Sequence, residues 1–170
     1  MPSGSLKLRG RVRAVLGDNI DTDIIYPGRY LNITDREKTA EHLFELAYPE
    51  IRTQLQPGEF IVAGKNFGCG SSREQAPVAL KEAGVGAVVA GSFARIFYRN
   101  AINIGLPVIE CPEAFELFKT GDVALINVDK GILVNETTGK SLRFKPMPEF
   151  LRDIMNNGGL VRYTKEKLRR

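Results

Sequence analysis

Cysteine and histidine are scarce in this sequence, which has two cysteines, Cys69 and Cys111, and one histidine, His42. Two cysteines are too few for a disulfide framework, and their separation excludes a CxxC redox motif. Iron–sulfur clusters typically take three or four thiolates from the chain that holds them. We therefore expect this chain to bind no metal or cluster by itself, and any metal in its chemistry to come mainly from elsewhere.

Long apolar runs are absent too, since none approaches the ~20 residues that cross a bilayer. The sequence starts MPSGSLKLRG, without the apolar segment of a secretory signal, so a cytoplasmic protein is expected. The net charge of +4 is a mild basic bias, part of which lies in the tail, residues 163–170. Basic stripes interleaved with aromatic residues are missing, and nucleic-acid binding is not expected.

The 170 residues, 43% apolar and 26% charged, fit one globular domain with a core over about residues 6–160. Residues 7–16 alternate polar and apolar, which predicts a strand with one wet face. A helix is expected over residues 36–47, capped by Thr34 or Asp35.

The centre of the chain alternates short apolar runs with helical patterns, which predicts parallel βαβ units. Strands are expected at 60–63, 85–91 and 106–110, and helices at 74–84, at 92–105 with Ser92 as cap, and at 112–118. Residues 122–145 read as strands with two turns, and 148–159 as the last helix. The fold class is therefore a mixed α/β domain with central βαβ units and flanking β segments.

The stretch KNFGCGSSRE, residues 65–74, follows the strand at 60–63 and is expected to lead into a helix that starts near Ser71. Glycines such as Gly70 let the backbone approach a ligand closely, and unpaired N–H groups of a helix start attract anions. Arg73 adds a planar fork that matches a carboxylate, and Ser71 and Ser72 add hydroxyls. A carboxylate site is the better interpretation, although a simple serine N-cap is the alternative.

Other anion-binding and nucleophile motifs do not fit this stretch. It lacks the Gly-Lys-Ser/Thr of a P-loop, and Arg73 stands where a dinucleotide-binding fingerprint needs its third glycine. No histidine partner for Ser71 is evident, which disfavours a Ser-His-Asp hydrolase.

Residues 64–110, which contain GSSRE, resemble the swivelling domain of the aconitase superfamily, and specifically its family of 3-isopropylmalate dehydratase small subunits. The stretch GDNIDTDIIYPGRYLNITD, residues 17–35, resembles the N-terminal signature of the same family. The resemblance runs from about Leu6 to the C-terminal helix and implies a swivelling β/α domain.

The family resemblance also implies a heteromer with a partner, the large subunit. That subunit would carry a [4Fe–4S] cluster on three cysteines, with one iron open to substrate. That iron would act as Lewis acid for the leaving hydroxyl. By matching position, Ser71 would be the base, and Ser72, Arg73 and the adjoining Gly70 would bind the substrate carboxylate. Related members often have histidine where this chain has Gln75, which leaves the support of Arg73 open.

The segment Tyr30, Leu31, Asn32 and Ile33 aligns with the loop that reads the substrate's side group in this family. A homoaconitase-type loop has arginine at the place of Asn32, so its absence argues against a tricarboxylate, and Ile33 can pack on an isopropyl group. An ordinary loop is the alternative, and Arg29 could still supply a charge.

Arg95 and Arg99 lie four residues apart on one expected helix face and either surround the site or form surface ion pairs. Cys69 is interpreted as a small filler and His42 as a solvent-side residue without a chemical role. The spacing of Asp21 and Asp23 does not fit a calcium loop, so turn formation and capping are expected for both.

The family resemblance implies a hydro-lyase that interconverts 2-isopropylmalate and 3-isopropylmalate in leucine biosynthesis, active only with its large subunit. Related hydro-lyases acting on homocitrate, citraconate or dimethylmalate are the first alternative. A carboxylate-binding module without chemistry is the alternative from another class.

Overall fold

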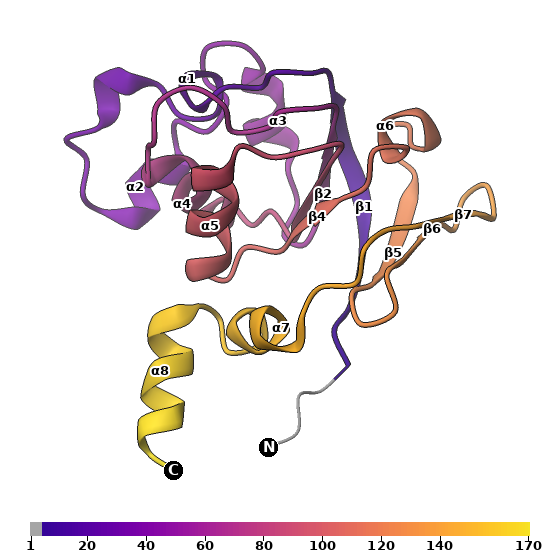
Figure 1. Cartoon of the computed structure of the whole chain (residues 1–170). Coiled ribbons are helices and arrows are strands. Elements are labelled where there is room, and N and C mark those ends of the chain that lie inside the picture. Colours follow the sequence, from indigo (N-terminus) through magenta and orange to yellow (C-terminus); the bar gives the residue numbers. More distant parts are fainter. Residues whose placement is uncertain (1–4) are drawn as a thin grey trace.

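The computed structural model describes residues 5–170, which form a seven-stranded mixed sheet with helices around it (Figure 1). The strands are β1 (Lys7–Leu16), β2 (Phe60–Ala63), β3 (Ala87–Ala90), β4 (Val108–Glu110), β5 (Val123–Asn127), β6 (Ile132–Asn135) and β7 (Lys140–Arg143). The helices are α1 (Thr22–Ile25), η1 (Gly28–Tyr30), α2 (Arg36–Ala40), α3 (Pro49–Gln54), α4 (Gln75–Glu82), α5 (Arg95–Asn103), α6 (Ala114–Leu117), α7 (Glu149–Asn156) and α8 (Leu160–Leu168).

Strand β1 belongs to both halves of the sheet, whose order is β4-β3-β2-β1-β5-β6-β7. Its second half pairs in parallel with β2, and β2, β3 and β4 continue in parallel. Its first half, up to Arg11, pairs antiparallel with β5, and a register shift between Val12 and Ala14 interrupts the pairing with β2. The predicted βαβ centre and flanking β segments are confirmed.

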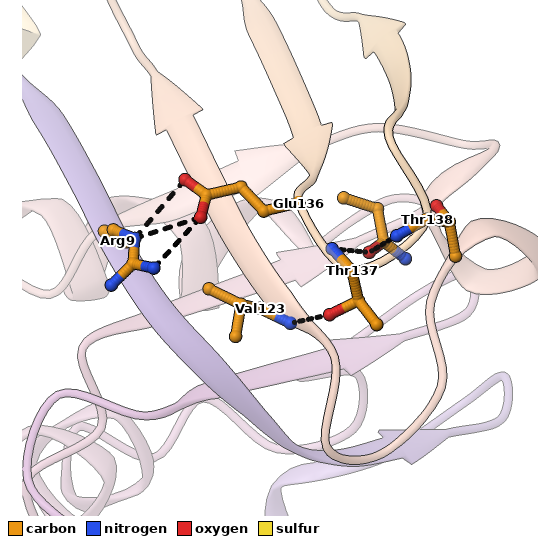
Figure 2. Close-up of polar contacts among 6 residues, drawn as sticks. Arg9, Val123, Glu136, Thr137 and Thr138 are labelled. Carbon is orange, nitrogen blue, oxygen red and sulfur yellow. Dashed lines mark hydrogen bonds and ion pairs between the residues drawn. The ribbon is translucent and has the colours of Figure 1, made fainter.

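Two strands of the parallel half are buried along their whole length, whereas buried and half-buried residues alternate along β5 and β6 of the antiparallel half. Every residue of β2 and β3 is buried, as in parallel strands with both faces covered. In the antiparallel half, the Arg9 guanidinium pairs with Glu136 at 3.0 Å, and the Val123 N–H donates to the Thr137 hydroxyl at 2.9 Å (Figure 2). The side-chain oxygen of the fully buried Asn135 accepts from the N–H groups of Thr137 and Thr138.

Within the parallel half, a shielded ion pair joins Arg13 of β1 to Glu59, the residue before β2. Two hydrogen bonds of 2.7 and 2.8 Å join them, and the Gln56 N–H donates to the same carboxylate. The Arg13 hydrogen bond holds the pKa of Glu59 below its ordinary value of 4.5, and the Glu59 side chain is 8% exposed.

Glu59→Gln is expected to lower the free energy of unfolding near neutral pH by about 2 kcal/mol, because charged hydrogen bonds are lost. Since the pKa of Glu59 is lowered by folding, its contribution is complete above pH 4.5 and is lost as the pH falls through the folded value. Urea denaturation at several pH values should therefore show a difference that shrinks in acid. Glu136→Gln, in a more exposed pair, is the control with the smaller effect; a pH-independent difference for Glu59→Gln would contradict the assignment.

The predicted continuous helix over residues 36–47 is wrong. Asp35 caps α2 as expected, but α2 ends at Ala40 and a series of turns follows. Phe44 adopts a left-handed backbone with φ 55° and donates its N–H to the Ile25 carbonyl at 2.9 Å. Its ring is fully buried, so core packing and this tertiary bond override the helical pattern.

Two predicted helix starts are also wrong. The helix predicted over residues 74–84 is confirmed as α4, which begins at Gln75, so the start near Ser71 is the part that is wrong. Helix α5 begins at Arg95 with Ala94 rather than Ser92 as cap. The Ser92 hydroxyl instead accepts the Asn66 N–H at 2.8 Å and so fixes the loop that follows β2.

The predicted end of the chain's last helix at Gly158-Gly159 is confirmed for α7, but α8 follows and contains most of the basic tail. Both C-terminal helices contact α5 (Figure 1). A β carbon at Gly105 would lie 2.6 Å from the Gly158 backbone, so the end of α5 and the α7–α8 turn approach closely. The Lys81 ammonium donates to the Ile104 and Gly158 carbonyls and thereby joins α4 to this junction.

Within residues 5–170, no helix combines the length and the apolar character that crossing a membrane requires.

Candidate functional site

The two signature stretches of the sequence lie side by side. We call residues 65–74 the serine loop. Its backbone bonds to residues 19–22 at three points: the Asn19 N–H donates to Lys65, the Gly68 N–H to Ile20, and the Thr22 N–H to Cys69. These bonds measure 2.7 to 2.8 Å. The N-terminal signature therefore serves as a support for the serine loop.

Glycine is required in the serine loop for two reasons. Gly68 and Gly70 have φ of 82° and 91°, in the left-handed region that side chains disfavour. A β carbon at Gly68 would also lie 2.2 Å from Cγ of Phe97, whose ring is buried in the core. Gly68 therefore lets the loop pack directly on α5.

A cavity of about 460 Å³ lies between the serine loop and the first two turns of α5. The serine-loop side and its support contribute Thr22, Gly68, Gly70, Ser71, Ser72 and Arg73. Helix α5 and the residue before it contribute Ala94, Arg95, Ile96, Phe97, Arg99 and Asn100. The structure thus brings every predicted residue of the GSSR stretch together with Arg95 and Arg99.

Ser71 and Ser72 are exposed at the cavity, whereas the Arg73 side chain is only 17% exposed. Arg73 Nη1 donates to Asp23 Oδ1 at 2.7 Å and to the Tyr26 carbonyl at 3.2 Å. The bond from Arg73, followed by one from the Gly28 N–H, lowers the pKa of Asp23. Asp23 therefore orients Arg73 in this chain, which has Gln75 where related members often have histidine.

The late start of α4 changes the expected source of anion attraction. The Arg73 N–H donates to the Ser71 carbonyl at 2.9 Å, the Ala76 N–H donates to the Arg73 carbonyl, and Pro77 has no N–H. These groups are therefore not free for a ligand. The hydroxyls of Ser71 and Ser72 and the guanidinium groups are the better candidates for binding a carboxylate.

The arginines of α5 are available for an anion. Arg95 and Arg99 are exposed residues that line the cavity, and no carboxylate among residues 5–170 lies within ion-pair distance of either one. Of the two interpretations of this pair, the structure favours the one in which they surround the site.

The predicted specificity segment, residues 30–33, does not line the cavity. It is fixed beside the site by a bond from the Tyr26 hydroxyl to the Tyr30 carbonyl at 2.8 Å and from the Gln75 amide to Leu31 at 3.3 Å. The Tyr30 ring stacks on His42 with centroids 3.6 Å apart, so the prediction that His42 faces solvent is wrong. Asn32 is exposed and Ile33 is half-buried.

Sequence patterns missed several residues of this site. Thr22 and Ile96 line the cavity, and Asp23 binds Arg73. The Asp-Thr-Asp run at residues 21–23 was expected only to cap and turn, which Asp21 does by accepting the Ile24 N–H. In the structure, Ile96 stands out because its large apolar side chain is 54% exposed.

Neither cysteine is an activated thiol. Burial is the main cause that raises the pKa of Cys69, and burial raises the pKa of Cys111 to about 11. Thiolates are the reactive form, so both groups stay protonated near neutral pH. Among the residues that the structure describes, no group of three His, Cys, Asp or Glu side chains could hold a metal ion.

Cys69→Ala is accordingly expected to leave kcat within about threefold of the parent, because a protonated thiol contributes neither a base nor a ligand. Steady-state rates of the hydro-lyase that the family resemblance implies, reconstituted with its large subunit, would measure this. A loss of tenfold or more in a folded variant would contradict the filler assignment.

Residues 18–114 match the family model described as the aconitase C-terminal domain. The chain is thus an aconitase-type C-terminal domain.

Comparison with individual proteins narrows this class. The 3-isopropylmalate dehydratase small subunits of Moorella thermoacetica and Caldanaerobacter subterraneus are 56% and 50% identical over 153 residues, which is 90% of this chain and 92% and 95% of theirs. The crystal structure of a 3-isopropylmalate dehydratase from Methanocaldococcus jannaschii superposes with a TM-score of 0.87, at 43% identity over 96% of both chains. The chain belongs to the family of 3-isopropylmalate dehydratase small subunits.

Proposed function

We propose that this chain and a large subunit form a hydro-lyase that interconverts 2-isopropylmalate and 3-isopropylmalate by dehydration and rehydration, in leucine biosynthesis. The observation that carries the proposal is the cavity that joins Ser71, Ser72 and Arg73 with Arg95 and Arg99, which form no ion pair with any carboxylate among residues 5–170. It offers hydroxyls and cations to a dicarboxylate, and its members match the family's GSSR stretch.

In this proposal Ser71 Oγ takes the proton from the carbon α to a substrate carboxylate. The electron pair of that C–H bond forms the new C=C bond, and the hydroxyl on the neighbouring carbon leaves with its electron pair as hydroxide. This hydroxide and the proton taken up by Ser71 together make up the water that is released. Rehydration in the opposite orientation gives the isomer. An alkoxide is costly in water, so Ser71 depends on nearby positive charge, which Arg73, Arg95 and Arg99 supply at this cavity.

Ser72 and Arg73 would bind the carboxylate next to the acidic carbon, with the Gly70 backbone leaving room for it. Arg73 is held ready by Asp23, so little side-chain entropy is lost on binding. A [4Fe–4S] cluster, expected in the large subunit, would supply a Lewis acid for the leaving hydroxyl. No step of the small subunit's own chemistry requires it to bind that metal.

Substrate choice is proposed to involve residues 30–33. Asn32 and Ile33 offer no cation for an additional carboxylate, and an isopropyl group can pack on Ile33. The segment is tied to the first residue of α4, directly after the serine loop, through the Leu31–Gln75 bond. We further propose a cytoplasmic heterodimer or heterotetramer.

Reconstitution tests this function. The chain is co-expressed with the candidate large subunit and purified anaerobically, and dehydration of 3-isopropylmalate and of homocitrate is followed by absorbance of the unsaturated product. Turnover of 3-isopropylmalate alone is the expected result. Turnover of homocitrate as well would show that Asn32 does not exclude a tricarboxylate. No turnover despite an intact cluster would favour a carboxylate-binding module.

A further inference from the structure

Thr22 holds the serine loop at two points. It is the first residue of α1, is 3% exposed and borders the cavity. Its N–H donates to the Cys69 carbonyl at 2.8 Å, and its hydroxyl donates to the Ser71 carbonyl at 2.9 Å. The two bonds lie on either side of Gly70, which, as a glycine, has little intrinsic backbone restraint.

Ser71 has little other support. It is exposed, and residues 71–73 form no regular secondary structure before α4 begins at Gln75. Its carbonyl accepts one other bond, from the Arg73 N–H at 2.9 Å, and this donor is part of the same loop. The Thr22 hydroxyl is therefore the long-range bond that fixes the Ser71 carbonyl relative to the fold.

Thr22 itself is rigidly placed. The Asp21 side chain caps α1 through the Ile24 N–H at 2.8 Å, and the Thr22 carbonyl accepts the Tyr26 N–H at 2.8 Å. Ile25 and Tyr26, which follow, are fully buried. Because α1 is anchored in the core, the bonds from Thr22 hold the serine loop at a fixed place in the fold.

We propose that Thr22 is a positioning residue for the reaction, whose hydroxyl fixes Ser71 so that its Oγ faces the substrate's acidic C–H bond. This inference rests on the proposed role of Ser71 as base. The hydroxyl proton of Thr22 is committed to the Ser71 carbonyl, so Thr22 acts through geometry and exchanges no proton with substrate.

The test compares two variants in the reconstituted complex. Thr22→Val keeps the volume and removes the hydroxyl, whereas Thr22→Ser keeps the hydroxyl. Since a misplacement of 1 Å can cost about 100-fold, Thr22→Val is expected to lower kcat by about 10-fold or more with KM within about threefold. Thr22→Ser is expected to stay within about threefold of the parent kcat.

A matched control is available at Thr39. This threonine is 2% exposed and its hydroxyl also donates to a carbonyl, that of Arg36, but it does not line the cavity. Thr39→Val reproduces the loss of a buried hydroxyl without touching the serine loop, and its kcat should equal the parent value.

A second readout does not depend on turnover. In the full chain without its partner, the amide NMR signals of Gly70 and Ser71 are expected to shift and to gain mobility in Thr22→Val, and to keep parent-like mobility in Thr22→Ser. Thermal unfolding of each variant establishes that it folds. If Thr22→Val does not fold, Thr22→Ala takes its place.

The outcomes separate this inference from the proposed function. Loss of turnover in Ser71→Ala together with an unchanged kcat in Thr22→Val would overturn the role of Thr22 and leave the function intact. Full turnover in Ser71→Ala would overturn both. A raised KM at unchanged kcat, no rescue by Thr22→Ser, or unfolding of both Thr22→Val and Thr22→Ala would assign Thr22 to binding or to stability and would also overturn the positioning role.

Discussion

Ser71→Ala is expected to lower kcat for 3-isopropylmalate by about 10³-fold, because a positioned general base contributes about 10²–10⁴-fold to proton transfer. KM should change by less than about threefold, since the carboxylate contacts of Ser72 and Arg73 remain. The measurement is a steady-state assay of the complex with equal cluster content in parent and variant. The Ser71 side chain is exposed at the cavity rather than buried in the core, so the variant should fold.

Cys69→Ala is the matched control for Ser71→Ala, because it also removes one heteroatom from the serine loop. A Ser71→Ala enzyme that keeps more than about a tenth of its kcat would fall outside the range of a lost general base. In that case the loop would bind substrate without taking its proton, as a carboxylate-binding module does.

Arg73→Lys is expected to lower kcat/KM by about 100-fold, mainly through KM. A lysine keeps the positive charge but cannot reproduce the planar fork, and hydrogen bonds to charged groups contribute about 1.5–3 kcal/mol. Lysine also cannot bond Asp23 and the Tyr26 carbonyl in the way that Arg73 Nη1 does. Initial rates over a range of substrate concentrations, together with direct binding of substrate by calorimetry, would measure both effects.

Arg9→Lys is the control for Arg73→Lys. Arg9 also pairs with a carboxylate, that of Glu136, but it lies on β1 and does not line the cavity. Parent-like KM in both variants would show that substrate does not bind Arg73, and the carboxylate site would then have to be sought at Arg95 and Arg99.

The sheet followed from local patterns, since alternation in residues 7–16 and apolar runs at 60–63 and 85–91 each predicted a strand that the structure contains. The helix predicted over residues 36–47 failed at Phe44. Its apolar side chain fits a helical stripe, but its left-handed backbone is set by a bond to Ile25, which no local pattern contains.

For the candidate site too, local patterns predicted residues but not the long-range contacts that hold them. The composition of residues 68–73 was enough to predict an anion site, and the family resemblance supplied roles for Ser71 and Arg73. The bonds that hold these two residues come from Thr22 and Asp23, about fifty positions earlier in the chain. Spacing within one motif cannot reveal a contact between two motifs. The early start assigned to α4 failed because the serines resemble a cap, whereas Ser71 lies in irregular backbone before the helix.

The shared strand β1 has a consequence for how the chain is made. Its parallel partner β2 is synthesised about fifty residues later, but its antiparallel partner β5, which pairs Asn127 with Lys7, follows only after more than a hundred. During translation, the first half of β1 is therefore an open edge after β2–β4 have emerged from the ribosome. Open edges attract other strands, so the newly made chain is most exposed to aggregation until Val123–Asn127 has emerged.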